Sequence, residues 1–441
     1  MKKRLISMVL LAAMTVSLAA CGKDKATEKK EEKGIATKIE KPVEISFWHA
    51  MKGANEEALK KLTDDFEKKN ENIKVNLVYQ GSYRDLFDKL MGAAKSNTLP
   101  NMTQIYSNRL SWYVEKGLAE DLKPYMTNKE VGLSDESIKD VPEMFLKDGE
   151  WDGKQYAFPL NKSQMVLYYN EDMLKAKNVE VPKTWDELKE AAKKLTVDNN
   201  NDGTPEVYGL ALENNISTDI GIWVKQAGGE VIDEKADKIN FNTPETKAAV
   251  EFIASMINDK TARLAGEDKN ANTTFNQEKA AMAICSTSAI PYIQKGMKAK
   301  WFSAALPTYK EDVQLYYGTN VAVFNGGSDE QKLASWLYIK YLTDTENTAY
   351  FSENTGYIPV RKSAFESENY KKFLSENPVK KVPLETLDKG WQGARNIGVI
   401  PALDTLGGEL EQVFKGQKSV DDALKSAQEK GEAAMKEARS N

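Results

Sequence analysis

The sequence has a single histidine, His49, and only two cysteines, Cys21 and Cys285, among 441 residues. A serine or cysteine nucleophile with a histidine base would have to use His49. The chain has no GxSxG turn, no HExxH pair and no glycine-rich phosphate loop. Cys285 lies in the apolar run AMAICSTSA with no histidine near it, so a buried structural thiol is favoured over a nucleophile. These absences argue against an enzyme, although a glycosidase-type pair of carboxylates cannot be recognised among 66 acidic residues.

The sequence also lacks an excess of positive charge and a second long apolar run. A net charge of −5 argues against nucleic-acid binding as the main activity. After the amino terminus no apolar run reaches the roughly 18 residues of a membrane span. No repeat is visible, which disfavours a solenoid. The remaining length, about 400 residues, is enough for two or more domains.

The amino terminus has the features of a secretory signal. The basic start MKKR precedes the apolar run LISMVLLAAMTVSLAA, which ends at Cys21. This pattern predicts a signal peptide over residues 1–20. The stretch LAACG resembles a bacterial lipoprotein box, which implies that Cys21 carries a lipid and anchors the protein outside the cytoplasm on the cell membrane. The alternative is an ordinary cleaved signal with a chance cysteine.

Residues 21–42 carry many charges of both signs and no aromatic side chain. A segment of this composition buries too little apolar surface to fold, so we expect a flexible tether between the lipid and the globular part. A basic patch that contacts lipid headgroups is the weaker alternative, because acidic residues largely cancel the lysines.

From residue 43 onward, segments with strand spacing alternate with segments of helical spacing. Strands are predicted over 43–48, 73–79 and 102–106, and helices over 56–69 and 83–95 lie between them. This rhythm indicates right-handed crossovers and a parallel sheet. The fold class is therefore α/β.

A second block of the chain repeats the strand and helix patterns. Thr184 and Ser419 are predicted to cap helices, the second of which runs to about residue 438. The other elements expected here are strand-like runs over 156–170, 280–285 and 315–325 and helices over 244–258 and 329–342.

Aromatic and small polar residues recur near the predicted strand ends. In open parallel sheets, ligands bind at the carboxyl ends of strands, where rings can stack on sugars and amides and hydroxyls can bind their OH groups. Core packing is the alternative for each single aromatic. The residues are Trp48, Tyr83, Tyr106, Tyr317, Tyr357 and Trp391, with Ser82, Asn161, Ser163, Ser286, Ser288, Thr319 and Asn320.

The segment DNNNDGTPE carries oxygen-bearing residues at alternate positions. Its candidate ligands are Asp198, Asn200, Asp202, Thr204 and Glu206, with Gly203 at the turn. This pattern resembles the start of a calcium loop, so a structural calcium ion is one prediction. The bidentate glutamate of such loops is missing, because Gly209 stands at the twelfth position. An Asn/Gly-rich turn without metal is the alternative.

Several motifs together resemble the extracellular solute-binding proteins (family 1) of carbohydrate-type ABC importers. They are the lipoprotein box, FWHAMKG, QGSY, PLNKSQMVLYYNEDML, TWDELKEAAKKL, EKAAMAICSTSA, LPTY, YYGTNVAVF and NTGYIPVRKSA. The resemblance implies a two-lobed periplasmic-binding-protein-like fold (type II, maltose-binding-protein-like) with a hinge and a ligand cleft between the lobes. The expected boundaries are 43–157 plus 316–353 for lobe 1 and 158–315 plus 354–441 for lobe 2. It also implies a monomer that delivers a small solute to permease subunits served by a cytoplasmic ATPase.

Within that family, the glycerol-3-phosphate and glycerophosphodiester binders share the most features with this chain. Carried over by position, Trp48 and His49 lie at the cleft, Tyr83, Ser163 and Tyr357 contact the ligand, Gly318 offers its backbone, and Ser286 to Ser288 face the ligand. Arg395 would hold the phosphate, since its planar fork donates two parallel hydrogen bonds. For Arg395 an ion pair across the lobes is the alternative. His49 is expected to pack at the cleft edge or hinge rather than act as a base.

The chain departs from the glycerol-phosphate binders at two places. Ser107 replaces an acidic residue, and Asn215 and Thr218 replace paired tryptophans, for which Trp223 is a partial substitute. A neutral sugar or oligosaccharide is therefore as well supported as a polyol phosphate. A signalling or adhesive lipoprotein on the same fold is the alternative function, which a neighbouring permease gene would argue against.

Overall fold

The structure, a computed structural model, describes residues 34–214 and 216–440. The predicted signal peptide and Cys21 lie outside these residues. Residues 34–42 contain no helix or strand, yet Ile35, Ala36 and Ile39 pack against a hydrophobic cluster. This end of the expected tether therefore lies against the globular unit. In the part of the chain that is described, no helix is long and apolar enough to cross a membrane.

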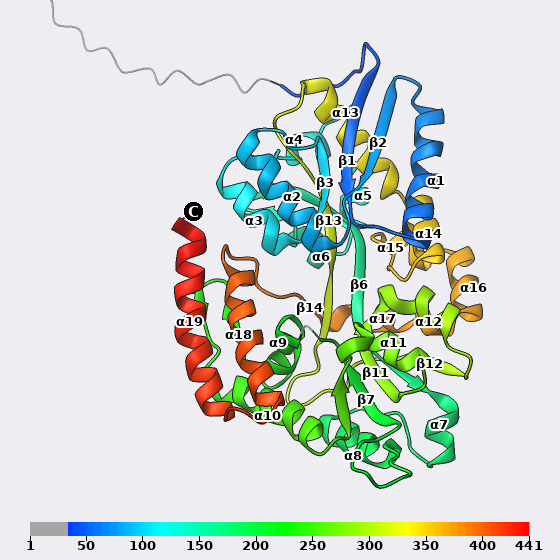
Figure 1. The fold of residues 1–441 in the computed structure, drawn as a ribbon. Coiled ribbons are helices and arrows are strands. Elements are labelled where there is room, and N and C mark those ends of the chain that lie inside the picture. Colours follow the sequence, from blue (N-terminus) through cyan, green and yellow to red (C-terminus); the bar gives the residue numbers. More distant parts are fainter. Residues whose placement is uncertain (1–33, 215, 441) are drawn as a thin grey trace, which may run out of the picture. The chain divides into compact units, whose positions relative to one another are not determined.

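Three strands form a parallel arrangement at one end of the main sheet. β1 (Val43–His49) lies between β2 (Ile73–Tyr79) and β3 (Met102–Ile105). Helices α1 (Ala54–Lys69) and α2 (Tyr83–Ser96) follow β1 and β2 and make the crossovers, as predicted. We call the part of the unit built on these strands lobe 1. Its first part, drawn in blue and cyan in Figure 1, also contains α3 (Ser107–Glu115), α4 (Lys123–Met126), α5 (Asp135–Lys139), α6 (Glu143–Lys147), β4 (Glu150–Trp151) and β5 (Lys154–Gln155). Two later helices, α13 (Asp329–Leu342) and α14 (Thr345–Asn354), drawn in yellow, complete lobe 1.

Two long strands carry the sheet out of lobe 1. β6 (Ala157–Asn170) and β13 (Gln314–Val323) pair antiparallel with each other, and β13 also pairs antiparallel with β3. The order is β10-β7-β11-β6-β13-β3-β1-β2, so the sheet is mixed rather than all parallel. The strand–helix rhythm predicts the crossovers of lobe 1 but not this pairing, because β6 and β13 meet across a long connection. Figure 1 shows both strands running between the two parts of the unit.

The second part, lobe 2, is built on the other end of the sheet. β11 (Ala280–Ser286) pairs antiparallel with β6 and parallel with β7 (Tyr208–Leu212), and β10 (Ala262–Leu264) forms the edge. Lobe 2 also contains α7 (Glu171–Ala176), α8 (Trp185–Leu195), α9 (Ile216–Gln226), β8 (Ile232–Asp233), β9 (Lys238–Ile239), α10 (Pro244–Asn258), α11 (Ala271–Asn276), α12 (Ile290–Gly296), β12 (Trp301–Ala304), β14 (Gly390–Trp391), α18 (Val399–Phe414) and α19 (Val420–Ser440). The short helices α15 (Lys362–Glu366), α16 (Glu368–Glu376) and α17 (Val382–Glu385) lie between β13 and β14 in the chain.

The predicted helix starts are confirmed at two caps. The Thr184 hydroxyl accepts a hydrogen bond from the Glu187 amide at 3.2 Å, and α8 begins at the next residue. Ser419 accepts one from the Asp422 amide at 3.1 Å before α19. Each cap satisfies a backbone donor that the first helical turn leaves unpaired.

Each lobe has its own hydrophobic core. Phe47, Phe66 and Trp336 belong to the main cluster of lobe 1, and Trp185 and Leu406 to that of lobe 2. Ile358 and Val360, which follow residue 353, pack in the lobe 1 cluster. The exact lobe boundaries stay a prediction. Two separate cores joined mainly by β6 and β13 allow the lobes to move as rigid bodies, with the motion confined to the strands that connect them.

Candidate functional site

The strands β6 and β13, which join the lobes, carry polar side chains where they pass from one lobe to the other. Asn161, Lys162, Ser163 and Gln164 of β6 are at most 2 % exposed. The Lys162 ammonium donates to Asp148 Oδ2 at 2.5 Å, and Asn320 Nδ2 of β13 donates to the same oxygen at 2.9 Å. Buried charges persist only where such partners compensate their lost hydration. This buried ion pair ties lobe 1 to both crossing strands.

Gly318 lies opposite Lys162 in the β6–β13 ladder. Its φ of 120° is a conformation that residues with a side chain rarely adopt, and a Cβ there would come within 2.2 Å of the Asn161 carbonyl oxygen. The position therefore requires glycine because the two strands approach closely, whether or not its backbone also meets a ligand.

A hydrogen-bonded network lies where β3, β6 and α2 meet. Gln104 Nε2 donates to Asn161 Oδ1 and to the Tyr83 hydroxyl, each at 3.0 Å, and Asn161 Nδ2 donates to the Tyr83 hydroxyl at 3.3 Å. Two amides thus donate to one phenol oxygen, and the Tyr357 hydroxyl also donates to it. The network holds both phenols in place and leaves the Tyr357 oxygen as an acceptor.

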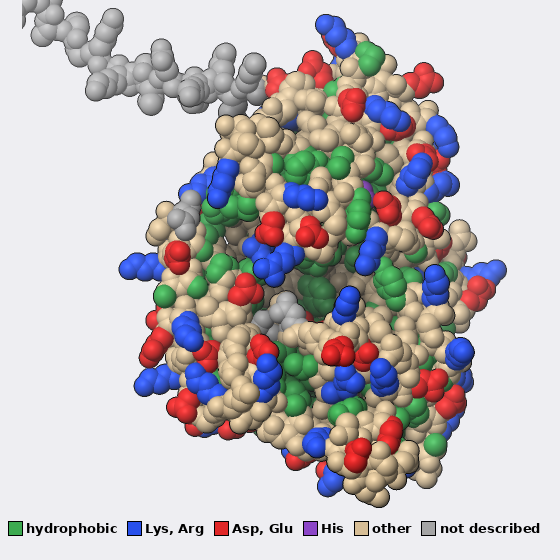
Figure 2. Space-filling view, in the orientation of Figure 1, with side chains coloured by type: hydrophobic (Ala, Val, Ile, Leu, Met, Phe, Trp, Pro, Cys, Tyr) green, Lys and Arg blue, Asp and Glu red, His purple; other side chains and the backbone are tan. Residues whose placement is uncertain are grey.

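A cavity of about 330 Å³ opens beside these phenols, between the lobes. Lobe 1 contributes the segments after β1 and β2, and lobe 2 contributes Ser288 and Tyr292. Tyr79 and Tyr292 are 46 % and 43 % exposed, which is unusual for such large rings. Figure 2 shows the surface hollowed at the level where the lobes meet. The lining residues are Ala50, Met51, Lys52, Asn55, Tyr79, Gly81, Ser82, Tyr83, Ser288, Tyr292 and Tyr357.

The cavity brings together part of the predicted site. Tyr83, Ser288 and Tyr357 line it, and Asn161 supports it from below. Ser286 stands behind Ser288, whose hydroxyl donates to it at 3.0 Å. Trp48 is half-buried at the end of β1 and packs with the second lobe 1 cluster, outside the lining.

Ser107, Ser163 and Trp223 are among the predicted residues that do not line the cavity. Ser107 is buried and accepts a hydrogen bond from Asn320 Nδ2 at 2.9 Å, so it serves the Asp148–Lys162 pair. Ser163 is 2 % exposed within β6. Trp223 is 1 % exposed in the lobe 2 core, 5.5 Å from the Trp185 ring, so it does not substitute for a tryptophan wall.

His49 is 1 % exposed at the end of β1, between the rings of Phe47 and Tyr79. Burial lowers the pKa of its imidazole to about 4, and its Nδ1 has no hydrogen-bond partner among the described residues. The imidazole is therefore neutral at physiological pH. Its position fits packing behind the cavity, where it supports Tyr79.

Arg395 makes contacts with both lobes. Its Nη2 lies 2.8 Å from Glu234 Oε1 of lobe 2, while Nη1 donates to the carbonyl oxygens of Lys147 and Glu150 in lobe 1. Its guanidinium also lies 4.7 Å from the centroid of the Trp151 ring. The ion pair with Glu234 therefore lies within lobe 2, while the hydrogen bonds to the two carbonyl oxygens cross to lobe 1; together these contacts leave little of the planar fork for a phosphate.

Two carboxylates at the start of α9 were not recognised from the sequence. Burial raises the pKa of Glu213 to about 7, and the Glu213 Oε2 accepts a hydrogen bond from the Ala271 amide at 3.2 Å. Burial, reinforced by Glu213, raises the pKa of Asp219 well above its ordinary range. Asp219 also acts electrostatically on Tyr106, which precedes α3, and on Tyr317 of β13.

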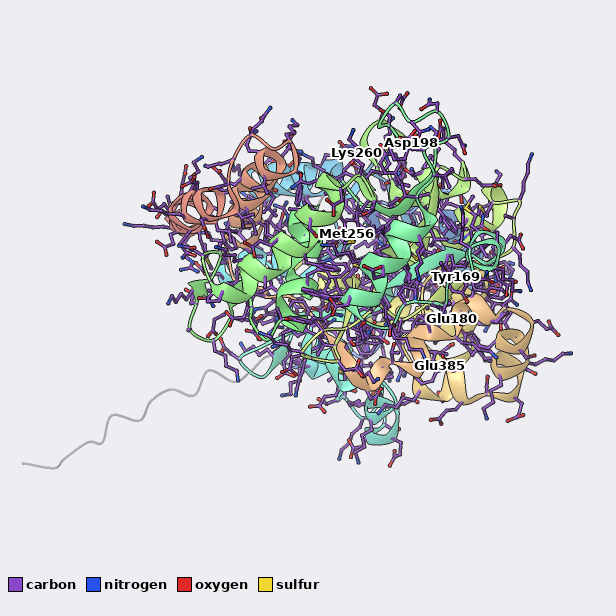
Figure 3. All side chains as sticks on the ribbon, turned by 90° about the horizontal axis from the view of Figure 1, so that it is seen from below. Tyr169, Glu180, Asp198, Met256, Lys260 and Glu385 are labelled. Atoms are coloured by element: carbon purple, nitrogen blue, oxygen red, sulfur yellow. The ribbon has the colours of Figure 1, made fainter. Side chains whose placement is uncertain are left out.

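The predicted calcium loop is closed by its own hydrogen bonds. Asp198 Oδ2 accepts from the Gly203 amide at 3.0 Å, Asp202 Oδ1 from the Thr204 amide at 2.7 Å, and Glu206 Oε2 from the Asn199 amide at 2.9 Å. Lys260 donates to the Gly203 carbonyl, and Figure 3 shows Lys260 near Asp198. Over residues 34–214 and 216–440, no three His, Cys, Asp or Glu side chains converge as a metal site. Calcium binding would require these oxygens to rearrange.

A larger depression, of about 750 Å³, lies on lobe 2 alone. It is bounded by the edge strand β10, by α18 and by the loop at Gly203 and Thr204, with Tyr208 and Phe414 among its lining residues. It contains none of the residues predicted to bind the solute and no residue of lobe 1. The cavity between the lobes is therefore the candidate site.

The cavity also contains residues that sequence reasoning missed, namely Lys52, Asn55, Tyr79 and Tyr292. Lys52 directly follows FWHAM, and Asn55 is the second residue of α1, which begins after Gly53. The only sequence signal for these two residues is their position between the end of a predicted strand and the start of the helix that follows it. Nothing in the sequence places Tyr292 of lobe 2 opposite Tyr79.

The geometry agrees with the comparisons to known proteins. Residues 61–375, well over half of the chain, match the family described as bacterial extracellular solute-binding protein. The chain belongs to this family. Members of this family bind solutes, and this solute-binding protein captures a small molecule for an ABC importer. Its two-lobed fold agrees with the fold expected from the sequence.

Curated relatives include the sn-glycerol-3-phosphate-binding periplasmic protein UgpB of Rhizobium meliloti, 26 % identical over 92 % of this chain and 97 % of the relative. Among solved structures, UgpB from Mycobacterium tuberculosis in complex with glycerophosphocholine superposes with a TM-score of 0.80, covering 90 % of this chain and 99 % of that one at 23 % identity. The Listeria monocytogenes protein Lmo0181 in complex with cycloalternan gives 0.78 at 22 % identity, covering 89 % and 99 %. These structures show the shared fold of this solute-binding protein.

Proposed function

We propose that this protein captures a small polyhydroxylated solute in the cavity between its lobes and delivers it to a membrane permease of an ABC importer. The solute is a sugar, a short oligosaccharide or a glycerol-phosphate-type polyol, the ligand classes named for its relatives. The observation that carries the proposal is the cavity itself, where phenols and hydroxyls of both lobes meet beside the crossing strands. Rings can stack on a sugar face, and hydroxyls can bind its OH groups.

Closure of the two lobes is the mechanism this arrangement supports. A solute that contacts Tyr83 in lobe 1 and Ser288 in lobe 2 binds the closed form better than the open form, so it shifts the population toward closure. The permease then distinguishes loaded from empty receptor by shape. No step of this cycle requires bond chemistry, and we infer that the protein is not an enzyme.

Ligand-induced stabilisation tests the proposal. We expect residues 22–441 to unfold at a higher temperature with glycerol-3-phosphate, glycerophosphocholine or a maltodextrin, because a ligand at about 100 times its Kd adds about 2.7 kcal/mol. Tyr357→Ala should remove the shift. Tyr309→Ala, which changes an exposed tyrosine outside the cavity, is the matched control and should keep it. A shift that survives Tyr357→Ala would place the ligand elsewhere.

The proposal includes a lipid anchor at Cys21, extracytoplasmic location and a monomeric state. The basic start, the apolar run and the stretch LAACG support the anchor. The curated relatives are periplasmic binding proteins, which supports the location. A monomer is the simplest form in which both lobes are free to close.

Calcium in the loop over residues 198–206 remains a proposal. The supporting observation is Asp198 Oδ1, a buried carboxylate oxygen without a hydrogen-bond partner among the described residues. If calcium binds, saturating calcium should raise the unfolding temperature of the wild type, and Asp198→Asn should abolish the effect. An identical unfolding temperature with calcium and with a chelator would rule the ion out.

A further inference from the structure

A buried lysine closes the carboxyl end of helix α14 in lobe 1. Lys380 is only 7 % exposed. Its ammonium donates to the backbone carbonyl oxygens of Ser352 and Glu353, each at 2.9 Å, and of Thr355 at 2.6 Å. The last carbonyls of a helix have no partner within it and form the negative end of its dipole, so a cation with three donors suits them. We call the Lys380 ammonium with these three carbonyls the Lys380 clamp.

Lys380 approaches α14 from the side of lobe 2. It ends the short 3-10 turn η3 (Pro378–Lys380), whose Val379 packs in a hydrophobic cluster of lobe 2. The Val379 carbonyl oxygen also accepts a hydrogen bond from the Ser303 hydroxyl of β12 at 2.8 Å. Phe351 of α14, in contrast, packs in the main cluster of lobe 1. The clamp therefore joins a turn anchored on lobe 2 to a helix anchored in lobe 1.

The chain that leaves the clamped helix end carries Tyr357 to the cavity. The Ser352 hydroxyl donates to the Tyr357 carbonyl oxygen at 2.7 Å, and the Tyr357 amide donates to the Thr355 hydroxyl at 3.2 Å. The Tyr357 ring stacks on that of Phe351, with the centroids 5.8 Å apart. Ser352 and Thr355 are thus bound to Lys380 through their carbonyl oxygens and to Tyr357 through their hydroxyls.

We propose that Lys380 is a positioning residue for solute capture, which fixes Ser352 and Thr355 and through them holds Tyr357 where its phenol lines the cavity. The proposal rests on the proposed function, because it concerns a residue of the same cavity. Lys380 is not among the residues that line the cavity, so it acts on the solute only through Tyr357. Since the clamp joins the two lobes, it also couples their relative position to the placement of this phenol.

The clamp should depend on the proton of Lys380. Burial lowers the pKa of its ammonium to about 8, although Glu353 acts in the opposite direction. A neutral amine has two N–H groups for three carbonyls and loses the charge that favours a helix end. Burial raises the pKa of the Glu353 carboxyl and of the phenols of Tyr357 and Tyr370, which also face the clamp, so the phenols keep their protons near pH 8.

Hydrogen–deuterium exchange of residues 22–441 without ligand tests the clamp itself. The Tyr357 amide donates to the Thr355 hydroxyl, and the Ile358 amide donates to the Lys162 carbonyl of β6 at 2.9 Å. Lys380→Met keeps the length of the side chain but removes its charge and its donors. We expect both amides to exchange about tenfold faster in this variant, because local opening around α14 becomes easier.

Lys340→Met is the matched control. Lys340 also donates to two backbone carbonyl oxygens, those of Val131 at 3.2 Å and Gly132 at 2.7 Å, but it does so inside lobe 1 and outside the cavity lining. This variant should leave the exchange of the Tyr357 and Ile358 amides unchanged. Equal exchange of these amides in wild type and in folded Lys380→Met would overturn the proposal.

Calorimetric titration with glycerophosphocholine and with maltotriose tests the effect on binding. Neither compound has a group that titrates near pH 8. Lys380→Met is expected to weaken binding about tenfold at pH 7, a coupling of ordinary size between two sites. Lys340→Met should bind as the wild type does. Wild-type affinity should fall as the pH rises through about 8, and Lys380→Met, which retains Glu353, should lack this step.

The outcomes separate the clamp from the proposed function. The pH profile needs no variant, so it tests the clamp even if Lys380→Met does not fold. A wild-type affinity that is the same at pH 7 and pH 9.5, or equal affinities of wild type and Lys380→Met at pH 7, would overturn the proposal. Faster exchange in Lys380→Met with no binding of either compound to folded wild type would support the clamp and count against the proposed function.

Discussion

Asp148→Ala is expected to lower the free energy of unfolding by about 3–5 kcal/mol, the usual cost of leaving a buried charge without its partner. The Lys162 side chain is 0 % exposed and has the Asp148 carboxylate as its counter-ion. Burial raises the pKa of Asp148, but Lys162, Ser107 and Asn320 outweigh burial and hold that pKa below its ordinary value. Urea denaturation at pH 7 measures the effect.

A double variant separates lost charge compensation from lost packing. Asp148→Leu combined with Lys162→Met removes both charges and should recover much of the stability that Asp148→Ala loses. Glu143→Ala, which breaks an exposed pair with Lys147, is the matched control and should leave stability unchanged within error. If Asp148→Ala lowered the free energy of unfolding no more than Glu143→Ala does, the Asp148–Lys162 ion pair would not contribute to the stability of the crossing strands.

The stability of the protein should fall as the pH drops from about 6.5 to about 4 because of His49. The imidazole has a pKa of about 4 when folded, against an ordinary value near 6.5. Between these values the unfolded chain binds a proton that the folded chain does not, so the stabilisation present above pH 6.5 is lost on acidification. The difference corresponds to about 3 kcal/mol. Urea denaturation of wild type and His49→Gln across pH 4–8 measures it.

The comparison with His49→Gln isolates this contribution from other titrating groups. Glu213, with a pKa of about 7, acts in the opposite direction, since its stabilisation is present at low pH and lost as pH rises through 7. That contribution is the same in both proteins and cancels in the difference. The stability gap between wild type and variant should therefore shrink toward pH 4, and parallel curves would contradict a buried neutral imidazole.

Local structure could be predicted closely because its causes are local. The helix over 329–342 and the strand over 73–79 have the predicted bounds, since apolar spacing and caps act within a few residues. The same holds for the cap residues Thr184 and Ser419. Tyr83, Ser288 and Tyr357 were placed at the cleft by their resemblance to a family, and they line one cavity.

Contacts between distant segments could not be predicted, because nothing local determines them. Gln104 and Asn161 are 57 positions apart and hydrogen-bond at 3.0 Å, and Arg395 meets Glu234 across 161 positions. The use of Ser107 inside lobe 1, rather than toward a solute, depends on Asn320 of β13. Trp223 was misplaced for the same reason, since a tryptophan at the right distance in sequence is buried by the neighbouring helices.

The central claim is that a solute binds between the lobes, and a crystal structure of residues 22–441 grown with glycerol-3-phosphate tests it most directly. We predict ligand density in the cavity bounded by Tyr83, Ser288 and Tyr357. Density in the lobe 2 depression beside Tyr208 and Phe414, with the cavity between the lobes empty, would contradict the account.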